Sequence, residues 1–507
     1  MKLLFIIPPQ IIKSAVGIDA QPSINIPLGV LYIAAYLRDQ NWLGEIEVYD
    51  GRLSAEKTRY GDDNALFGDS WETVAQTIKD FNPDVIGISN MFSWQIDGAI
   101  RVSQICKETC PEAITVLGGP HASSFPLDMI REPTIDYLVM GEGEERMYQF
   151  LNALENDEPI QIQGILGKED DFNLLRPNKK APIDFIMPLD LLPIPAYDLI
   201  DMERYFYLQS NGYSPRVREW GKRAVSLLTS RGCPHQCIFC SIQATMGYRF
   251  RHHTPEYVRA HIHYLIENYG IDYIHFEDDN FTHDTDRYDE IIDMLLELSP
   301  KIPWGTPNGV RADSWNPERI RRTKASGCQY LCIAIESSSQ RVINEVIKKR
   351  LDLSQVDFVM QECKEVGLPL LAFYVLGLPG ETAEEIQGTV DFAIDRYDRF
   401  NVYPSFSVAN PLPGTELYDI VLEQNLFAGV TAADPPKPNT IRTNEFDPDF
   451  IERVHNEALK RKAWITLKKM SSNPQTFKYY VELSWKNMWF FKRTLRSTID
   501  SILGSRD

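Results

Sequence analysis

Short apolar runs alternate with amphipathic stretches over the first 150 residues of the chain. The run at 2–7 predicts a buried strand that ends before Pro8, and residues 26–40 have their apolar side chains at helical spacing. The same patterns predict further strands at 45–50, 84–89, 114–119 and 135–144, and further helices at 71–81 and 96–108. Because strands that alternate with helices form a parallel sheet covered on both faces, residues 1–150 are predicted to form a doubly wound, Rossmann-like α/β domain.

Small and polar residues follow three of these predicted strands. They are Ser89 after the strand at 84–89, Gly118 and Gly119 with the nearby His121, and the turn of Gly141, Glu142 and Gly143. Sheets of this kind bind ligands beyond the carboxyl ends of their strands, so we expect the three turns to meet at one edge. Glycine at Gly118 and Gly119 permits close backbone approach, so this edge could admit a large flat ligand.

A second alternating series occupies residues 206–425, after a stretch at 151–205 that is rich in Pro, Asp and Asn and reads as a surface linker. Its predicted strands lie at 224–230, 271–278, 304–310, 330–337, 370–377 and 404–411, with helices between them. Six such units fit a partial (β/α)6 barrel, in which chemistry gathers on the loops that follow the strands.

The final region, residues 426–507, is predicted to be a mostly helical C-terminal domain. Its segment 479–497 mixes tryptophan and phenylalanine with lysine and arginine, which favours a helix packed against the barrel with a basic outer face. A membrane-surface helix is the alternative. No apolar run reaches the roughly 18 residues needed to span a bilayer, so we expect a cytoplasmic protein, peripheral to the membrane at most.

Composition narrows the class of protein and of partner. A chain of 507 residues with 43% hydrophobic content predicts several well-filled cores. The net charge of −19 argues against nucleic acid as a partner, because neutralising phosphates requires clustered lysine and arginine. Eight cysteines are too few for a disulfide scaffold, so reduced thiols or metal ligands are the better interpretation. Cys328, Cys332 and Cys363 fall in apolar surroundings, which favours core packing over a second cluster.

Three cysteines, Cys233, Cys237 and Cys240, follow the first predicted barrel strand at spacings of four and three residues. A compact loop can place three thiolates of this spacing around one [4Fe-4S] cluster and leave one iron open for a substrate or cofactor. Zinc is the alternative, but it favours paired CxxC motifs or added histidines. No second pair lies nearby, although His235, His252 and His253 are available.

The stretch from about 220 to 420 resembles the radical S-adenosylmethionine (radical SAM) superfamily, in which an aromatic residue, here Phe239, precedes the last cysteine. Carboxylates are charge-assisted acceptors for ammonium groups, and acidic residues follow the second barrel strand. The resemblance implies that S-adenosylmethionine is held at its amino group by Glu277, Asp278 and Asp279, at its ribose by Glu336, at its adenine and methionine by the turn of Gly377 and Pro379, and at its carboxylate by Arg311.

The first domain resembles the cobalamin-binding domains fused in front of radical SAM barrels, through the stretches 27–37, 84–89, 116–126 and 136–144. The resemblance implies that Ser89, Gly118, Gly119, His121, Gly141, Glu142 and Gly143 contact cobalamin. The DxHxxG motif that supplies a cobalt-ligating histidine is absent from the chain. His121 is one candidate for the lower ligand, and a backbone or tail contact is the other.

Together the two resemblances identify a cobalamin-dependent radical SAM enzyme similar to the class B methyltransferases. They imply methylation of an unactivated carbon in a small-molecule or lipid-like substrate, with [4Fe-4S], S-adenosylmethionine and cobalamin as cofactors and an external flavodoxin- or ferredoxin-type reductant. Tyr374 and Tyr418 are candidates to face the substrate. No residue is identified as the proton acceptor.

Three other functions remain open. A cobalamin-dependent cyclase or oxidative rearrangement enzyme would use the same cofactors without methyl transfer. An RNA methylthiotransferase would need a cysteine triad in the first domain, where only Cys106 and Cys110 occur. A non-enzymatic cobalamin sensor would not need the Cys233 loop.

Overall fold

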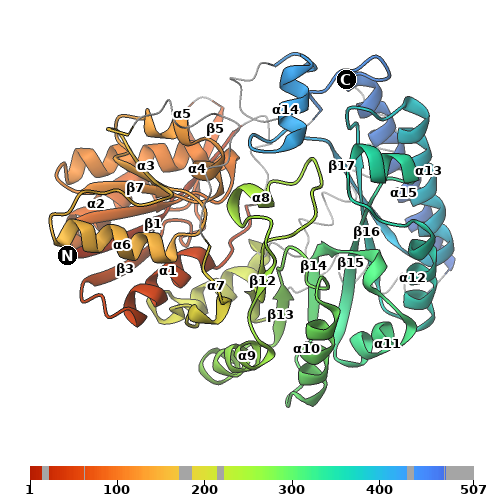
Figure 1. The fold of residues 1–507 in the computed structure, drawn as a ribbon, viewed down its shortest axis with the longest axis horizontal. Helices are drawn as coiled ribbons and strands as arrows, with labels where there is room; N and C mark the ends of the chain where they lie inside the picture. Colours follow the sequence, from red (N-terminus) through yellow and green to blue (C-terminus); the bar gives the residue numbers. More distant parts are fainter. Residues whose placement is uncertain are drawn as a thin grey trace.

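The computed structural model describes residues 1–13, 22–61, 63–170, 185–213, 222–430, 439–472 and 474. Two α/β units lie side by side, the first built on one parallel sheet and the second on a curved sheet with helices on its outer side (Figure 1). The short helix α8 (Ile242–Thr245) lies between them and packs against α4 (Pro120–Ser124) of the first unit. The predicted α/β fold with two units is confirmed.

The first unit is a six-stranded sheet in the order β3-β1-β6-β7-β8-β9. Its strands are β1 (Lys2–Ile7), β3 (Glu45–Asp50), β6 (Val85–Ser89), β7 (Ile114–Gly118), β8 (Tyr137–Val139) and β9 (Ile165–Gly167). All neighbours are parallel except β8 and β9. The chain runs from β1 to β3 on one side and then crosses to β6 on the other, so the winding reverses between β1 and β6.

Helices cover both faces of this sheet, as predicted. They are α1 (Leu28–Asp39), α2 (Trp71–Phe81), α3 (Ile96–Thr109), α4, α5 (Pro126–Ile130) and α6 (Glu144–Glu155). One apolar core lies under α2 and α3, and a second lies under α1 and α6. The apolar side of α1 predicted from spacing is buried, with Leu31 and Leu37 fully enclosed.

Several short elements were not predicted. A small antiparallel sheet has the order β2-β5-β4 and consists of β2 (Gln10–Ile12), β4 (Lys57–Tyr60) and β5 (Asn64–Phe67). Strand β9 lies within the stretch predicted as a linker, so the first sheet extends to Gly167 rather than ending near residue 150. Strands of three or four residues are too short to show a periodicity.

The second unit is a parallel sheet in sequence order, β10-β13-β14-β15-β16-β17. Its strands are β10 (Ala224–Leu227), β13 (Tyr273–Phe276), β14 (Trp304–Val310), β15 (Cys328–Glu336), β16 (Leu370–Leu376) and β17 (Tyr403–Val408). The main outer helices are α9 (Pro255–Tyr269), α10 (Thr285–Glu297), α11 (Pro317–Ala325), α12 (Ser354–Glu365) and α13 (Ala383–Phe400). Side chains of Thr254, Asp284, Asn316 and Thr382 cap α9, α10, α11 and α13, which explains where these helices begin. The predicted partial barrel is confirmed.

Three further cysteines are buried in the barrel, two in β15 and one in α12. Cys328, Cys332 and Cys363 are at most 2% exposed and belong to strand and helix packing, as expected from their apolar surroundings. Helix α15 (Pro448–Ser472) lies along α13 and β17 (Figure 1). Among the described residues, no helix combines the length and apolar character needed to cross a bilayer. The aromatic and basic segment 479–497 lies outside the described residues.

Candidate functional site

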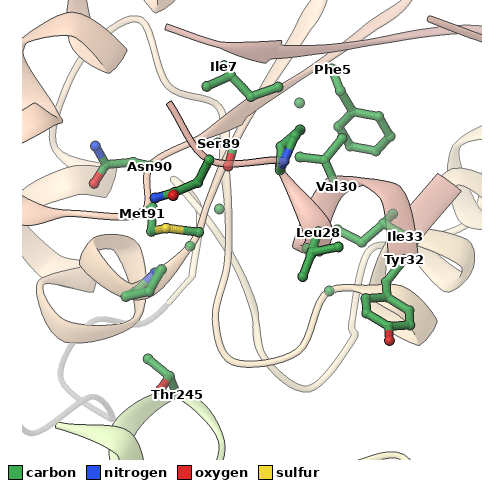
Figure 2. A pocket seen from close by; sticks show the side chains of 18 of the residues that line it. Phe5, Ile7, Leu28, Val30, Tyr32, Ile33, Ser89, Asn90, Met91 and Thr245 are labelled. Atoms are coloured by element: carbon green, nitrogen blue, oxygen red, sulfur yellow. The ribbon is translucent and has the colours of Figure 1, made fainter. Parts of the chain in front are cut away.

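A cavity of about 680 Å³ lies where the two units meet. The first unit contributes the carboxyl ends of β1, β6, β7 and β8, and the barrel contributes Ser226, Leu228, Glu277 and Asn308 from the ends of β10, β13 and β14. The cavity therefore begins at the point where the winding of the first sheet reverses, which is where such sheets bind ligands. The close view shows the end of β1, the turn after β6 and one side of α1 around the same space (Figure 2).

The three predicted turns lie together on this cavity wall. Ser89, the pair Gly118 and Gly119, and the turn 141–143 all line it. Asn90, Met91 and Phe92 continue the wall from the turn after β6, and Thr245 of α8 approaches from the barrel side (Figure 2). Parallel strands bring their carboxyl ends to one edge, which explains why residues so far apart in sequence meet here.

The wall fits a broad flat ligand such as a corrin ring. A Cβ atom added to Gly29 would meet no protein atom within 4 Å, and one added to Gly118 would come no closer than 3.9 Å to any. Both glycines line the cavity, so their missing side chains leave ligand space rather than packing space. Phe5, Ile7 and Leu28 add apolar surface next to this space (Figure 2). Large apolar cavities with a few polar groups are typical cofactor sites.

Gly119 has a different role from its neighbour. Its φ is +110°, and an added Cβ would lie 2.2 Å from the carbonyl oxygen of Asn90. Gly119 therefore shapes the turn itself, because no other residue has both the backbone freedom and the space.

His121 is not among the residues that line the cavity. Its ring is buried and stacks on Phe125 with ring centroids 4.6 Å apart, and burial lowers its pKa to about 4. Within the described part of the chain, its Nδ1 atom has no hydrogen-bond partner. The imidazole is thus neutral and stacked on Phe125, away from the residues that line the cavity. Its assignment as the lower ligand of cobalt stays a prediction.

The cysteine loop is closed at its base by two short antiparallel strands, β11 (Ser230–Arg231) and β12 (Arg251–His252). Gly232 begins the loop with φ +81°, and a Cβ there would lie 2.4 Å from the carbonyl oxygen of Arg249. In the middle of the loop, the backbone of Ile238 donates to the carbonyl of Ile347 at 3.2 Å and accepts from the amide of Leu417 at 2.8 Å. The loop is therefore fixed at its base and at its centre.

The three thiols of the loop are half-buried neighbours. Burial raises the pKa of Cys240 to about 12 and also raises the pKa of Cys233 and Cys237, and the three sulfurs repel one another as thiolates. Iron would compensate this cost, because a coordinating cation favours the thiolate. Among the described residues, no three His, Cys, Asp or Glu side chains converge on a position for a single ion. Three cysteine ligands leave one iron of a four-iron cluster open, so the donor set of this loop suits a cluster that also binds a further molecule.

The acidic residues after β13 point to three different places. Glu277 lines the cavity, and its Oε1 accepts from the hydroxyl of Ser226 at 3.3 Å. Asp278 is buried beneath it, where its Oδ1 accepts from the hydroxyls of Thr229 and Ser230 at 2.9 and 2.5 Å. Asp279 accepts from the amide of Gly232 at 3.1 Å, and burial raises its pKa to about 7. Glu277 therefore faces the cavity, while Asp279 supports the cysteine loop.

Glu336 and Arg311 both have partners within the protein. Glu336 ends β15 with φ +74° and receives the ammonium of Lys349 at 2.7 Å, in a pair whose side chains are 7% and 6% exposed. Arg311 makes two hydrogen bonds to Asp313, at 2.9 and 2.5 Å, and donates to the carbonyls of Lys349 and Arg350. Asp313 already occupies the fork of the Arg311 guanidinium.

The predicted glycine and proline turn follows β16. Gly377 has φ +87°, and the carboxylate of Glu381 accepts from the amides of Gly377 and Leu378 at 2.9 and 2.7 Å. Burial raises the pKa of Glu381 to about 8. Pro379 lies in the same turn and is partly exposed. Glu381 is the last residue of the predicted turn, but its hydrogen bonds to the turn's own amides were not predicted.

Glu142 has arginine partners that were not predicted. Its carboxylate lies 3.0 Å from Nη1 of Arg231 and 2.9 Å from Nη2 of Arg251, and Arg231 also contacts Glu144 at 2.7 Å. All four side chains are at most 5% exposed. Arg231 and Arg251 could be noticed in the sequence because they flank the cysteine loop. Nothing in the sequence indicated that Glu142 and Glu144 are their partners.

Two family models match the chain. Residues 16–151 match the B12 binding domain, and residues 227–393 match the radical SAM superfamily. The first match falls within the first unit and the second within the barrel, in the same order along the chain.

Among curated proteins, cytidylyl-2-hydroxyethylphosphonate methyltransferase of Streptomyces wedmorensis is 32% identical over 425 residues, which are 78% of each chain. The uncharacterized methyltransferase PH0819 of Pyrococcus horikoshii is 31% identical over 92% of each chain.

Among solved structures, the radical SAM methyltransferase TsrM of Kitasatospora setae gives a TM-score of 0.65 at 15% identity, covering 90% of this chain and 83% of TsrM. The cobalamin-dependent radical enzyme OxsB gives 0.70 at 16% identity, covering 99% and 72%. These similarities extend the shared fold across both units. The protein belongs to the cobalamin-dependent radical SAM enzymes, and its cofactors are cobalamin, a [4Fe-4S] cluster and S-adenosylmethionine.

Proposed function

We propose that the protein is a methyltransferase that transfers a methyl group to an unactivated carbon of a small molecule. The observation that carries this proposal is the shared cavity, whose wall comes from the cofactor-binding edges of both units. A substrate in it would meet groups held by the first domain and groups held by the barrel at the same time. Such proximity replaces an encounter of three separate molecules. The 32% identity to a phosphonate methyltransferase supports the same outcome.

Residues of the first domain would hold the cobalamin. Gly29 and Gly118 leave room for a flat ring, and Phe5, Ile7 and Leu28 exclude water from its face. Ser89 and Asn90 add polar groups at the end of β6. When bound, cobalamin supplies the methyl group, and the cluster with S-adenosylmethionine supplies one-electron bond cleavage.

Residues of the barrel would hold the cluster and S-adenosylmethionine. Cys233, Cys237 and Cys240 ligate the cluster, and Asp279 fixes the start of their loop through the amide of Gly232. Glu277 presents a carboxylate to the cavity for the methionine ammonium.

The outer strand ends would hold the remaining parts of S-adenosylmethionine. Glu336, held by Lys349, accepts from the ribose, and the turn of Gly377 and Pro379 borders the adenine. Arg311 binds the methionine carboxylate only if it releases Asp313.

The partners follow from this chemistry. A flavodoxin- or ferredoxin-type protein would supply the electron that reductive cleavage of S-adenosylmethionine requires. A lipid-like substrate and membrane contact through 479–497 remain predictions, since that segment lies outside the described residues.

The test is anaerobic turnover of the reconstituted protein with S-adenosylmethionine labelled in its methyl group. Cytidylyl-2-hydroxyethylphosphonate is the first substrate to try, because the relative from Streptomyces wedmorensis is named for it. We expect a labelled methylated product together with 5′-deoxyadenosine. The C237A variant, which lacks one cluster ligand, is the control and should form neither.

A cyclase is the second candidate. The anaerobic magnesium-protoporphyrin IX monomethyl ester cyclase of Rubrivivax gelatinosus is 25% identical over 84% of this chain and 71% of its own. Substrate-dependent 5′-deoxyadenosine formation without label in the product would favour ring closure and contradict methyl transfer.

A further inference from the structure

A buried cluster of four charges joins the two units at the edge of the cavity. Glu142 and Glu144 stand on either side of Gly143, after β8 and at the start of α6, and Arg231 and Arg251 stand in β11 and β12. Arg251 also donates to Glu142 Oε2 at 2.9 Å, so both carboxylate oxygens of Glu142 have an arginine within 3.0 Å. Glu142, Glu144 and Arg231 line the cavity.

The two arginines occupy the base of the cysteine loop. Arg231 and Arg251 are direct partners in the antiparallel pair of β11 and β12, which closes the loop. Arg231 is two residues before Cys233, and the intervening Gly232 is pinned by Asp279 at 3.1 Å. A displacement of Arg231 therefore reaches the first cluster ligand through a short and constrained stretch of backbone.

The two glutamates belong to a turn that was predicted to contact cobalamin. Gly141 and Gly143 of this turn line the cavity, and a Cβ at Gly143 would lie 2.7 Å from the side chain of Ile33. The turn is packed tightly against α1, so the backbone that carries both glutamates is the same backbone that shapes this part of the cavity wall.

Further contacts hold both arginine side chains in place, so neither can easily change partners. Arg251 donates to the carbonyls of Ile186 at 3.1 Å and Met246 at 3.0 Å, and the guanidinium of Arg231 lies 5.0 Å from the centre of the Tyr32 ring. A buried charge that loses its partner is strongly unfavourable, so the carboxylates and guanidiniums move together or not at all. This property distinguishes the cluster from the exposed ion pairs elsewhere in the chain.

We propose that Glu142, Arg231 and Arg251 are positioning residues that couple the cobalamin cavity to the cluster loop, so that cobalamin in the cavity raises the affinity for S-adenosylmethionine. By linkage, S-adenosylmethionine then raises the affinity for cobalamin by the same factor. The inference rests on the two cofactor sites of the proposed function but not on which group is transferred.

The test measures binding without turnover. The full chain, reconstituted anaerobically with an oxidised cluster, is titrated with S-adenosylmethionine by calorimetry with and without hydroxocobalamin. The reciprocal titration follows the absorbance of hydroxocobalamin with and without S-adenosylmethionine. We expect the wild-type protein to bind each ligand at least roughly fivefold more tightly when the other is present, the lower end of typical coupling.

The variant E142Q should bring both ratios close to one while iron and sulfide content stay unchanged. The variant E142D keeps the charge and should restore part of the coupling. The matched control is D289N, because Asp289 pairs with Arg319 at 2.8 Å between α10 and α11, within the barrel alone. It loses a carboxylate of a partly buried pair and should keep the wild-type ratios.

Two results would overturn the inference: wild-type ratios of one, or wild-type ratios retained in E142Q. If E142Q does not hold the cluster, R251K takes its place. Lysine keeps the positive charge but cannot span both carboxylate oxygens of Glu142. Wild-type ratios in R251K would equally contradict the inference. Coupled binding, together with substrate-dependent 5′-deoxyadenosine formation and no label in the product, would leave this inference standing and contradict methyl transfer alone.

Discussion

Replacing Gly118 by valine should weaken cobalamin binding without harming the folded protein. The position ends β7 and lines the cavity, and the protein atom nearest to an added Cβ is 3.9 Å away. The new Cβ therefore meets the protein only at ordinary van der Waals distance, and a β-branched residue suits a strand better than glycine by roughly 0.5–1 kcal/mol. Its methyl groups would occupy space that the ligand needs.

The affinity should fall by at least about tenfold, which corresponds to roughly 1.4 kcal/mol. The measurement combines a hydroxocobalamin titration followed by absorbance with thermal unfolding of the cofactor-free protein. We expect weaker binding with an unchanged or higher melting temperature, and unchanged iron content.

The neighbouring variant G119A is the matched control with the opposite outcome. Its Cβ would lie 2.2 Å from the carbonyl oxygen of Asn90, and φ is +110°, so the strained backbone alone costs roughly 1–3 kcal/mol. G119A should lower the melting temperature before any ligand is added. Unchanged cobalamin affinity in G118V would refute the placement of cobalamin against β7.

Three further predictions follow from the barrel. The C237A variant should lose the cluster, seen as the loss of brown absorbance and iron, while its cobalamin affinity stays near that of the wild type. K349M should leave the carboxylate of Glu336 buried without its partner, so we expect weaker S-adenosylmethionine binding and a free energy of unfolding lower by about 3–5 kcal/mol, measured by denaturant titration. Burial raises the pKa of Glu381 from 4.5 to about 8, so the folded protein keeps a proton that the unfolded chain releases, and stability falls as pH rises through that window. E381Q should remove this loss of stability. The free energy of unfolding of both cofactor-free proteins is measured by denaturant titration at pH 6 and pH 9, and the difference between them should shift in favour of E381Q at pH 9. A difference that does not change with pH would contradict the assigned pKa.

The regular elements could be predicted because each has a local signal. Buried parallel strands read as apolar runs, and the strands predicted at 304–310 and 370–377 agree with β14 and β16 to within a residue. Helix starts carry capping residues, as Thr254 and Thr382 do. The turns at Ser89, Gly118 and Gly141 could be brought to one edge by topology alone, since every parallel strand ends there.

Contacts between the units could not be predicted from local patterns. Glu144 and Arg231 are 87 residues apart, and no local sequence pattern around either residue indicates that they form an ion pair. Glu142 was assigned to cobalamin by the resemblance of the stretch 136–144 to cobalamin-binding domains, but its carboxylate is engaged by Arg231 and Arg251 of the barrel. His121 was assigned by the same resemblance, through the stretch 116–126, whereas its ring stacks on Phe125.

The position of Glu142 also bears on how the two cofactor sites work together. A side chain on the cavity wall whose oxygens are already paired can influence a ligand mainly through the backbone that it anchors. Gly141 and Gly143 supply that backbone, and both line the cavity on the side of the first domain. Arg231 stands on the other side of the same ion cluster, two residues before Cys233. Two domains that must present two cofactors to one substrate need a fixed distance between their sites, and a buried charge cluster holds that distance more strictly than an apolar contact, which can slide.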